Sequence, residues 1–93
     1  AAPFRLLFVC LGNICRSPTV EGIFRAQAEK SGWGSMFEVD SAGIVGSHAG
    51  EPPDRRAQRY AHERGYDLSG LRARQIGPHD FEAFDYVLAD RKS

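Results

Sequence analysis

The chain has 93 residues, of which 42% are hydrophobic and 26% are charged, and its 12 basic residues balance its 12 acidic residues. This length suits one small domain, and zero formal net charge excludes a general attraction to nucleic acid or to a membrane surface. Two cysteines five positions apart make no disulfide framework and lack the spacing of a structural zinc site.

The first predicted elements are a strand, a loop and a helix. Residues 6–9 form an apolar run typical of a buried parallel strand. Ser17 is expected as the N-cap of a helix, with Pro18 at its first position and Gly32 at its end. Apolar residues recur at helical spacing between them, at Val20, Ile23, Phe24 and Ala28. Residues 10–16 therefore join a strand to a helix, where open α/β sheets bind ligands.

The residue types of this loop predict phosphate binding and a nucleophile. A helix N-terminus offers unpaired N–H groups and partial positive charge, and the Arg16 guanidinium matches two phosphate oxygens. Gly12 and Asn13 tolerate the positive φ of a tight anion-binding turn. The pKa of the Cys10 thiol is expected well below its free value, and Ser17 is placed to donate to the sulfur. The alternative is a buried structural cysteine beside a surface arginine.

The rest of the chain alternates between strands and helices. Residues 37–42 are predicted as a second strand, and residues 43–53 as a loop because they hold glycines and prolines. Asp54 is expected to cap a second helix that ends at Gly65. This helix is expected to have Ala57, Tyr60 and Ala61 on one face. A short helical segment from residue 77 and a third strand at residues 86–89 complete a predicted parallel sheet.

Residues 8–18, Phe-Val-Cys-Leu-Gly-Asn-Ile-Cys-Arg-Ser-Pro, resemble the signature of the low-molecular-weight protein tyrosine phosphatases. The likeness runs in order through residues 40–43, 50–57, 72–76, 80–81 and 84–88, and so covers nearly the whole chain. It implies an α/β fold of three layers, αβα, with a central parallel sheet of the phosphatase I type that lacks the C-terminal strand and helix. Residues 1–93 would then be a single low-molecular-weight phosphatase-like domain, truncated at the C-terminus.

The resemblance implies a cysteine-dependent phosphomonoesterase, first of all a protein tyrosine phosphatase. Cys10 is expected to attack phosphorus, Arg16 and Ser17 to assist, and water to cleave the phosphocysteine. The phosphate oxygens would bind the loop residues Leu11, Gly12, Asn13, Ile14, Cys15 and Arg16. Expected partners are phosphotyrosine proteins or small aryl phosphates, with inorganic phosphate or another oxyanion in the loop. No nucleic acid, membrane, metal or organic cofactor is expected, and the setting is expected to be cytoplasmic.

The resemblance also assigns supporting roles. Ser41 matches the residue that holds Asn13 in its strained conformation, although it could be a surface turn hydroxyl. Cys15 could form a reversible disulfide that shields Cys10, or could simply pack. Where the family often has an aromatic crevice wall, this chain has Ser47 and His48, so His48 either replaces the wall or is solvated.

One further position departs from the family pattern, and several charged residues are expected to be ordinary surface residues. Arg64 stands where the family often has a histidine, and His62 is expected at the surface. The basic residues Arg55, Arg56 and Arg59 are expected to form a solvated helix face.

The family's general acid, the aspartate of an Asp-Pro dipeptide, has no counterpart in these 93 residues. Losing it is expected to slow turnover by about 10²–10⁴-fold, with Asp54, Asp90 and Glu51 as the available substitutes. Without a further strand, residues 86–89 would be an exposed sheet edge through which the chain could self-associate. The rival functions are an arsenate reductase-like enzyme, disfavoured because no cysteine follows Cys15, and a non-catalytic phosphate-binding or regulatory module.

Overall fold

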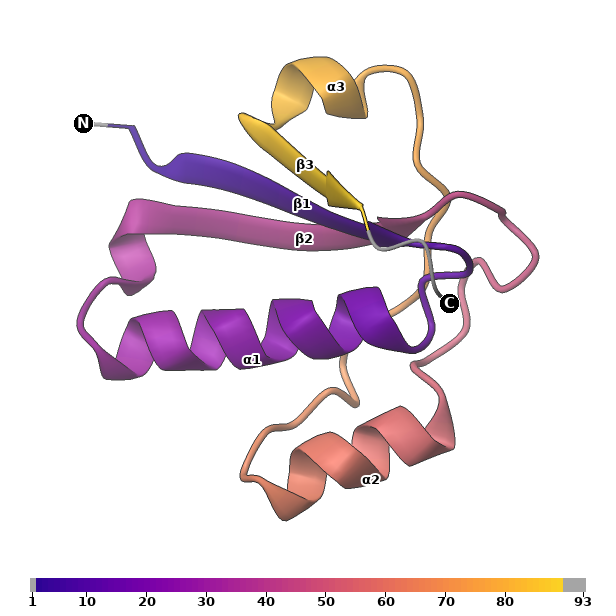
Figure 1. The fold of residues 1–93 in the computed structure, drawn as a ribbon, viewed down its shortest axis with the longest axis horizontal. Coiled ribbons are helices and arrows are strands. Elements are labelled where there is room, and N and C mark those ends of the chain that lie inside the picture. Colours follow the sequence, from indigo (N-terminus) through magenta and orange to yellow (C-terminus); the bar gives the residue numbers. More distant parts are fainter. Residues whose placement is uncertain (1, 90–93) are drawn as a thin grey trace.

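The computed structural model describes residues 2–89, which fold as the predicted alternation of strands and helices (Figure 1). The strands are β1 Phe4–Cys10, β2 Phe37–Gly43 and β3 Tyr86–Ala89. The α-helices are α1 Arg16–Lys30, α2 Arg55–Glu63 and α3 Asp80–Ala83, and a short 3₁₀ helix at Gly34–Met36 leads into β2. Among the described residues, no helix combines the length and hydropathy that crossing a membrane requires.

The three strands form one parallel sheet in the order β2-β1-β3, which confirms the predicted sheet. The apolar β1 lies in the centre, as expected for a strand that is covered on both faces. The register pairs Cys10 with Gly43 and Val9 with Ala89. The carboxyl ends of all three strands therefore meet at the edge of the sheet where the loop of residues 10–16 begins.

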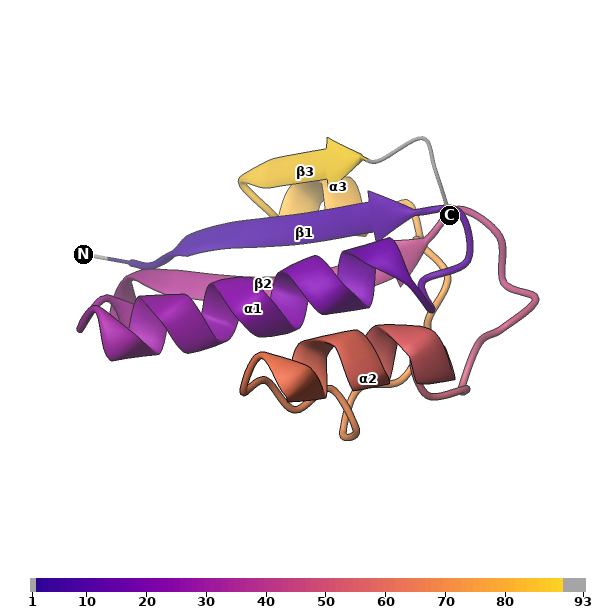
Figure 2. The same cartoon turned by 60° about the horizontal axis from the view of Figure 1, so that its bottom comes forward.

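The sheet is covered on both faces, so the predicted three-layer αβα fold is confirmed. Figures 1 and 2 show α1 and α2 on one side of the sheet and α3 on the other. On the α1 side, Phe8 contacts Phe24 with 5.8 Å between the ring centroids. On the α3 side, Leu7 and Val9 pack with Ala42, and the partly buried residues Ile76, Phe84 and Val87 extend this cluster. The α3 layer is thin, because it consists of one four-residue helix and its flanking loops.

The predicted start of α1 is wrong by two residues. The helix begins at Arg16, its N-cap is Cys15, and no side chain caps it. Ser17 lies inside the first turn because its hydroxyl is bonded elsewhere, and Pro18 is tolerated there because first-turn amides need no helical acceptor. Val20, predicted on the apolar face, is 45% exposed. The residues that α1 buries are instead Ser17, Pro18 and Glu21.

The second helix confirms its predicted boundaries. Asp54 is the N-cap, and its carboxylate accepts from the backbone N–H groups of Arg56 and Ala57. Of the three residues expected on one face, Ala57 and Ala61 are buried. Tyr60 is not: it is 49% exposed, and the Arg64 guanidinium lies 3.6 Å from its ring centroid. A side chain of that size cannot enter the small gap that the two alanines fill.

Candidate active site

Cys10 ends β1 and is fully shielded from solvent. Its Sγ lies 3.0 Å from the Ser17 Oγ, and the backbone N–H groups of Gly12, Asn13 and Ser17 are directed at the sulfur. Burial raises the pKa of the Cys10 thiol, but the hydrogen bonds from the Ser17 hydroxyl and from these amides outweigh it, so the pKa is lowered overall. The predicted direction of this shift is confirmed, and its cause is hydrogen bonding to the thiolate.

Two neighbouring segments bind the carbonyl groups of the loop through three backbone hydrogen bonds. The carbonyl oxygens of Cys10 and Leu11 accept from the backbone N–H groups of Ile44 and Val45, at 3.0 and 2.9 Å. The Ile14 carbonyl accepts from the backbone N–H of Asp54 at 2.6 Å. The chain after β2 and the start of α2 thus bind loop carbonyls, while loop amides are directed at the sulfur.

Gly43 lets the loop lie directly against β2. A Cβ at this position would lie 2.8 Å from the Gly12 carbonyl carbon and 3.0 Å from the Asn13 backbone nitrogen, both of which are main-chain atoms. The expected positive φ is found at Asn13, where φ is 58°, but not at Gly12. That part of the prediction is wrong, because a single left-handed residue is enough to turn the loop.

The side chain of Asn13 is buried and bonded on both sides. Its Nδ2 donates to the Ser17 and Ser41 hydroxyl oxygens, each at 2.9 Å, and its Oδ1 accepts from the backbone N–H of Arg74 at 2.9 Å. The expected contact between Ser41 and Asn13 is therefore present. The bond from Arg74 was not anticipated from the sequence.

Around Asn13 lie three further side chains that were not predicted from the sequence, those of Glu21, Arg74 and Asp80. Ser41 Oγ donates to Glu21 Oε1 at 2.7 Å, and Glu21 is 3% exposed. The Arg74 guanidinium holds the buried Asp80 carboxylate through two hydrogen bonds, at 3.0 and 3.1 Å. The resemblance includes residues 40–43, 72–76 and 80–81, and this was the available signal for Ser41, Arg74 and Asp80.

Arg16 and Cys15 lie at the junction of the loop and α1. Arg16 is exposed and lines two hollows on either side of Val20, one bounded by Leu88 and the other by Arg56 and Tyr60. Cys15 is partly buried, and both cysteines are free thiols.

Cys15 differs from Cys10 in its ionisation. Burial raises the pKa of the Cys15 thiol, the negative charges of Asp54 and of a Cys10 thiolate add to this effect, and Arg16 opposes it. The loop therefore holds one thiol that ionises readily and one that does not.

His48 lies against the loop. A Cβ on Gly12 would be 3.2 Å from the His48 Cδ2, so the imidazole packs over this glycine. His48 Nδ1 lies 3.2 Å from Glu51 Oε2. Ser47 is exposed, so His48 is the residue of this pair that borders the site. Of the acids considered as proton donors, Glu51 is engaged by His48, Asp54 caps α2, and Asp90 lies outside the described residues.

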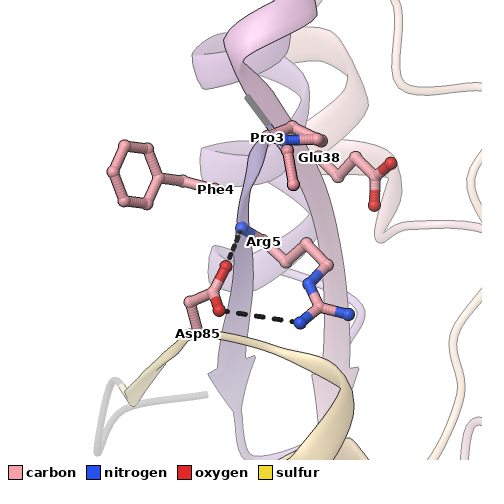
Figure 3. Close-up of a pocket in the computed structure, with 6 residues that line it drawn as sticks. Pro3, Phe4, Arg5, Glu38 and Asp85 are labelled. Atoms are coloured by element: carbon pink, nitrogen blue, oxygen red, sulfur yellow. Dashed lines mark hydrogen bonds and ion pairs between the residues drawn. The ribbon is translucent and has the colours of Figure 1, made fainter.

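A larger hollow lies at the opposite end of the sheet (Figure 3). It is lined by residues of the N-terminal segment and the strand starts, namely Ala2, Pro3, Phe4, Arg5, Glu38 and Asp85. The Arg5 guanidinium lies 3.6 Å from the Asp85 carboxylate, and the Arg5 backbone N–H donates to it at 2.8 Å. No nucleophile lies among these residues. Within residues 2–89, no group of three or more potential metal ligands occurs.

Comparison with known proteins agrees with this geometry. A family model described as low molecular weight phosphotyrosine protein phosphatase matches residues 5–92. The low molecular weight protein-tyrosine-phosphatase YfkJ of Bacillus subtilis is 48% identical over 84 residues, which are 90% of this chain and 54% of that protein. The human low molecular weight phosphotyrosine protein phosphatase is 46% identical over 83 residues, which are 89% of this chain and 52% of the human protein.

Solved structures show the same likeness. The crystal structure of YfkJ superposes with a TM-score of 0.93 at 45% identity and covers 96% of this chain and 56% of that one. A protein tyrosine phosphatase from Entamoeba histolytica superposes with a TM-score of 0.88 at 37% identity, over 92% of this chain and 55% of that one. The chain thus spans about half the length of the relatives it matches.

Proposed function

The chain belongs to the low molecular weight phosphotyrosine protein phosphatase family, and from this membership we propose that it is a cysteine-dependent phosphomonoesterase. The proposed substrates are phosphotyrosine proteins and small aryl phosphates, with inorganic phosphate or a similar oxyanion bound in the loop. We propose that residues 1–93 form one phosphatase-like domain that supplies the nucleophile and the phosphate cradle.

The observation that carries this proposal is the environment of Cys10. Its thiol is buried, its pKa is lowered, and three backbone N–H groups and the Ser17 hydroxyl are directed at its sulfur. A structural cysteine would have a raised pKa in a buried position, because burial disfavours the thiolate. The arrangement instead stabilises the nucleophilic form.

The proposed reaction has two displacements at phosphorus. In the first, the Cys10 thiolate forms the S–P bond while the bond from phosphorus to the leaving oxygen breaks, and that oxygen takes up a proton. In the second, a water oxygen attacks phosphorus and loses a proton, the S–P bond breaks, and the thiolate is regenerated with release of phosphate. The Ser17 hydroxyl stabilises the sulfur as a leaving group in this step.

The remaining loop residues bind the transferred group in this proposal. The backbone N–H groups of residues 11–16 and the Arg16 guanidinium receive the equatorial oxygens of phosphorus, where charge accumulates in the transition state. Asn13 and Ser41 keep the loop in shape through the hydrogen bonds described above.

Protonation of the leaving oxygen is the step with no assigned donor. Of the considered acids, Asp54 and Glu51 are engaged in other contacts. Turnover by this chain should therefore depend steeply on the leaving group, with aryl phosphates hydrolysed slowly and alkyl phosphates hardly at all. Equal rates for good and poor leaving groups would show that another residue donates the proton.

We also propose a redox role for Cys15, as the partner of Cys10 in a reversible disulfide that protects the nucleophile. Its nearness in sequence and its place on the same loop support this role, and both thiols are reduced in the structure. A thiolate nucleophile operates in a reducing compartment, and the cytoplasm is the proposed setting.

The test is hydrolysis of p-nitrophenyl phosphate by the unmodified chain, by Cys10→Ser and by the surface control His62→Gln. We expect hydrolysis to vanish in Cys10→Ser and to persist in the control, together with a phosphorylated thiol that acid quenching traps in the unmodified chain. Phosphate binding without Cys10-dependent hydrolysis would refute the phosphatase and favour a phosphate-binding module.

A further inference from the structure

Glu21 is a buried carboxylate that the proposed reaction does not use. It lies on α1, one turn after Ser17, with 3% of its surface exposed. Its Oε1 accepts from the Ser41 hydroxyl and its Oε2 from Arg25, both at 2.7 Å. Burying a carboxylate costs free energy, because the charged group loses its contact with water. The hydrogen bonds that Glu21 accepts close to the loop offset part of this cost.

The hydrogen bonds between Glu21 and the loop have a fixed direction. The Arg74 backbone N–H can only donate, so the atom of Asn13 that faces it is the amide oxygen. The amide nitrogen of Asn13 therefore faces the two serine hydroxyls and gives one hydrogen to each. Each hydroxyl oxygen acts as an acceptor toward Asn13, and each hydroxyl proton is directed to the other neighbour.

These other neighbours are the Cys10 sulfur for Ser17 and the Glu21 carboxylate for Ser41. The distance between Cys10 and Ser17 does not by itself say which atom donates. The direction of the Asn13 amide settles this point, because it makes Ser17 the donor and the sulfur the acceptor. An anionic acceptor at each end suits this polarity.

We propose that Glu21 is a positioning residue for the phosphate loop: it accepts the Ser41 proton and thereby holds Asn13 in place. Asn13 in turn keeps the Ser17 proton on the Cys10 sulfur. The loop needs this restraint because Asn13 has a φ of 58°, which is unfavourable for a residue with a side chain. An effect of Glu21 on turnover depends on the proposed phosphatase function, whereas its effect on the Cys10 thiolate does not.

The test is titration of the Cys10 thiolate by its ultraviolet absorbance, with Cys10→Ser subtracted to remove the signal of Cys15. Glu21→Leu and Glu21→Met remove the acceptor while filling its volume, a change that buried charges often tolerate without loss of stability. We expect the Cys10 midpoint to rise by about one pH unit, which is a tenfold change in its ionisation constant. Glu29→Gln, an exposed change on the same helix, should leave the midpoint unchanged.

Ser41→Ala tests the route of the effect. It should raise the midpoint by a similar amount, and adding Glu21→Leu to it should change nothing further, because both residues act through one contact. Additive shifts, or an unchanged titration in a folded Glu21 variant, would overturn the proposal. An unchanged titration in Ser41→Ala would overturn it even if neither Glu21 variant folds.

These outcomes are separate from the test of the phosphatase itself, because thiolate titration needs no substrate. A chain without hydrolysis but with a Glu21-dependent thiolate would refute the proposed function and support the role of Glu21. Conversely, hydrolysis by a folded Glu21→Leu with an unchanged Cys10 titration would leave the phosphatase standing and exclude that role.

Discussion

The two ends of the central sheet both carry charged side chains beside a hollow, but they are organised differently. At the amino end, Arg5 and Asp85 face each other with 45% and 39% of their side chains exposed (Figure 3). At the carboxyl end, the polar side chains of Asn13, Ser17 and Ser41 are buried and hydrogen-bonded to one another. Among the described residues, no buried side-chain nitrogen or oxygen lacks a hydrogen-bond partner.

The volume of a pocket therefore does not identify the candidate active site in this molecule. The pocket at the amino end measures about 540 Å³, and the two pockets that Arg16 lines measure about 170 Å³ and about 510 Å³. Water screens the electrostatic interaction between the exposed Arg5 and Asp85 side chains, so this pair has little influence on the ionisation of neighbouring groups. At the carboxyl end, burial strengthens each dipole and fixes its direction, and these are the conditions that stabilise a thiolate.

The largest expected contrast between the two ends comes from matched aspartate changes. Asp80→Asn at the carboxyl end should lower the free energy of unfolding by about 2–3 kcal/mol, because two hydrogen bonds from Arg74 lose their charged acceptor. Asp85→Asn at the amino end should cost under about 1 kcal/mol. Urea denaturation of both variants measures the difference. Equal losses would mean that the ends of the sheet do not differ as described.

The next contrast concerns close packing under the loop. Gly43→Ala forces a methyl group against main-chain atoms of Gly12 and Asn13, and overpacking of this kind costs about 1–3 kcal/mol. We expect the variant to bind phosphate more weakly as well, because the loop must move away from β2. Gly70→Ala is the control, since a Cβ there meets no atom within 4 Å and its φ is not positive.

Calorimetry with inorganic phosphate and urea denaturation report the two effects of Gly43→Ala separately. If Gly43→Ala binds phosphate as tightly as Gly70→Ala, contact with β2 does not shape the loop.

The sequence predicted the elements well because their signals are local. The apolar run before Cys10, the capping residue Asp54 and the glycines after α1 and α2 each act within a few positions of the structure they determine. The residue types at positions 10–17 likewise predicted the loop between β1 and α1 and the lowered pKa of the Cys10 thiol. These features need no knowledge of which segments meet in space.

The support of the loop was harder to predict because it is long-range. Serine is a preferred N-cap residue, but the Ser17 hydroxyl is hydrogen-bonded to the Cys10 sulfur. This tertiary contact overrides the local preference, and Ser17 lies inside the helix. Glutamate is usually a surface residue on a helix, and the burial of Glu21 depends on its contacts with Ser41 from β2 and with Arg25. Arg74 contributes a backbone N–H to Asn13, and every residue except proline has one, so the residue type at position 74 does not predict this hydrogen bond.

The third prediction uses two buried carboxylates whose pKa values shift in opposite directions. Hydrogen bonds from Arg74 lower the pKa of Asp80, so its stabilising effect is present above the usual aspartate pKa of about 3.9 and is lost as the pH falls through its lower folded value. Burial raises the pKa of Glu21, so this residue makes the fold more stable as the pH falls from its raised value toward about 4.3.

Urea midpoints measured from pH 7 down to pH 3 should separate these two effects. In the unmodified chain, Glu21 should make the fold more stable on mild acidification, and Glu21→Leu should remove this gain. Asp80→Asn should reduce the loss of stability that the unmodified chain shows at lower pH. Asp85→Asn, a change to the exposed carboxylate at the amino end of the sheet, is the control. Parallel profiles in all four proteins would show that neither buried carboxylate titrates with folding.

The smallest expected effect concerns the free side of β3, which lies at the edge of the described sheet. Tyr86 and Leu88 point to the same face as Phe8, by the register with β1, and are 55% and 48% exposed. The self-association predicted from the sequence would use this edge, because apolar edge strands pair readily. Leu88→Lys should weaken it about tenfold, through lost apolar burial and charge repulsion between copies. Sedimentation velocity over a range of concentrations measures the change, and a single monomeric species at every concentration of the unmodified chain would exclude the association.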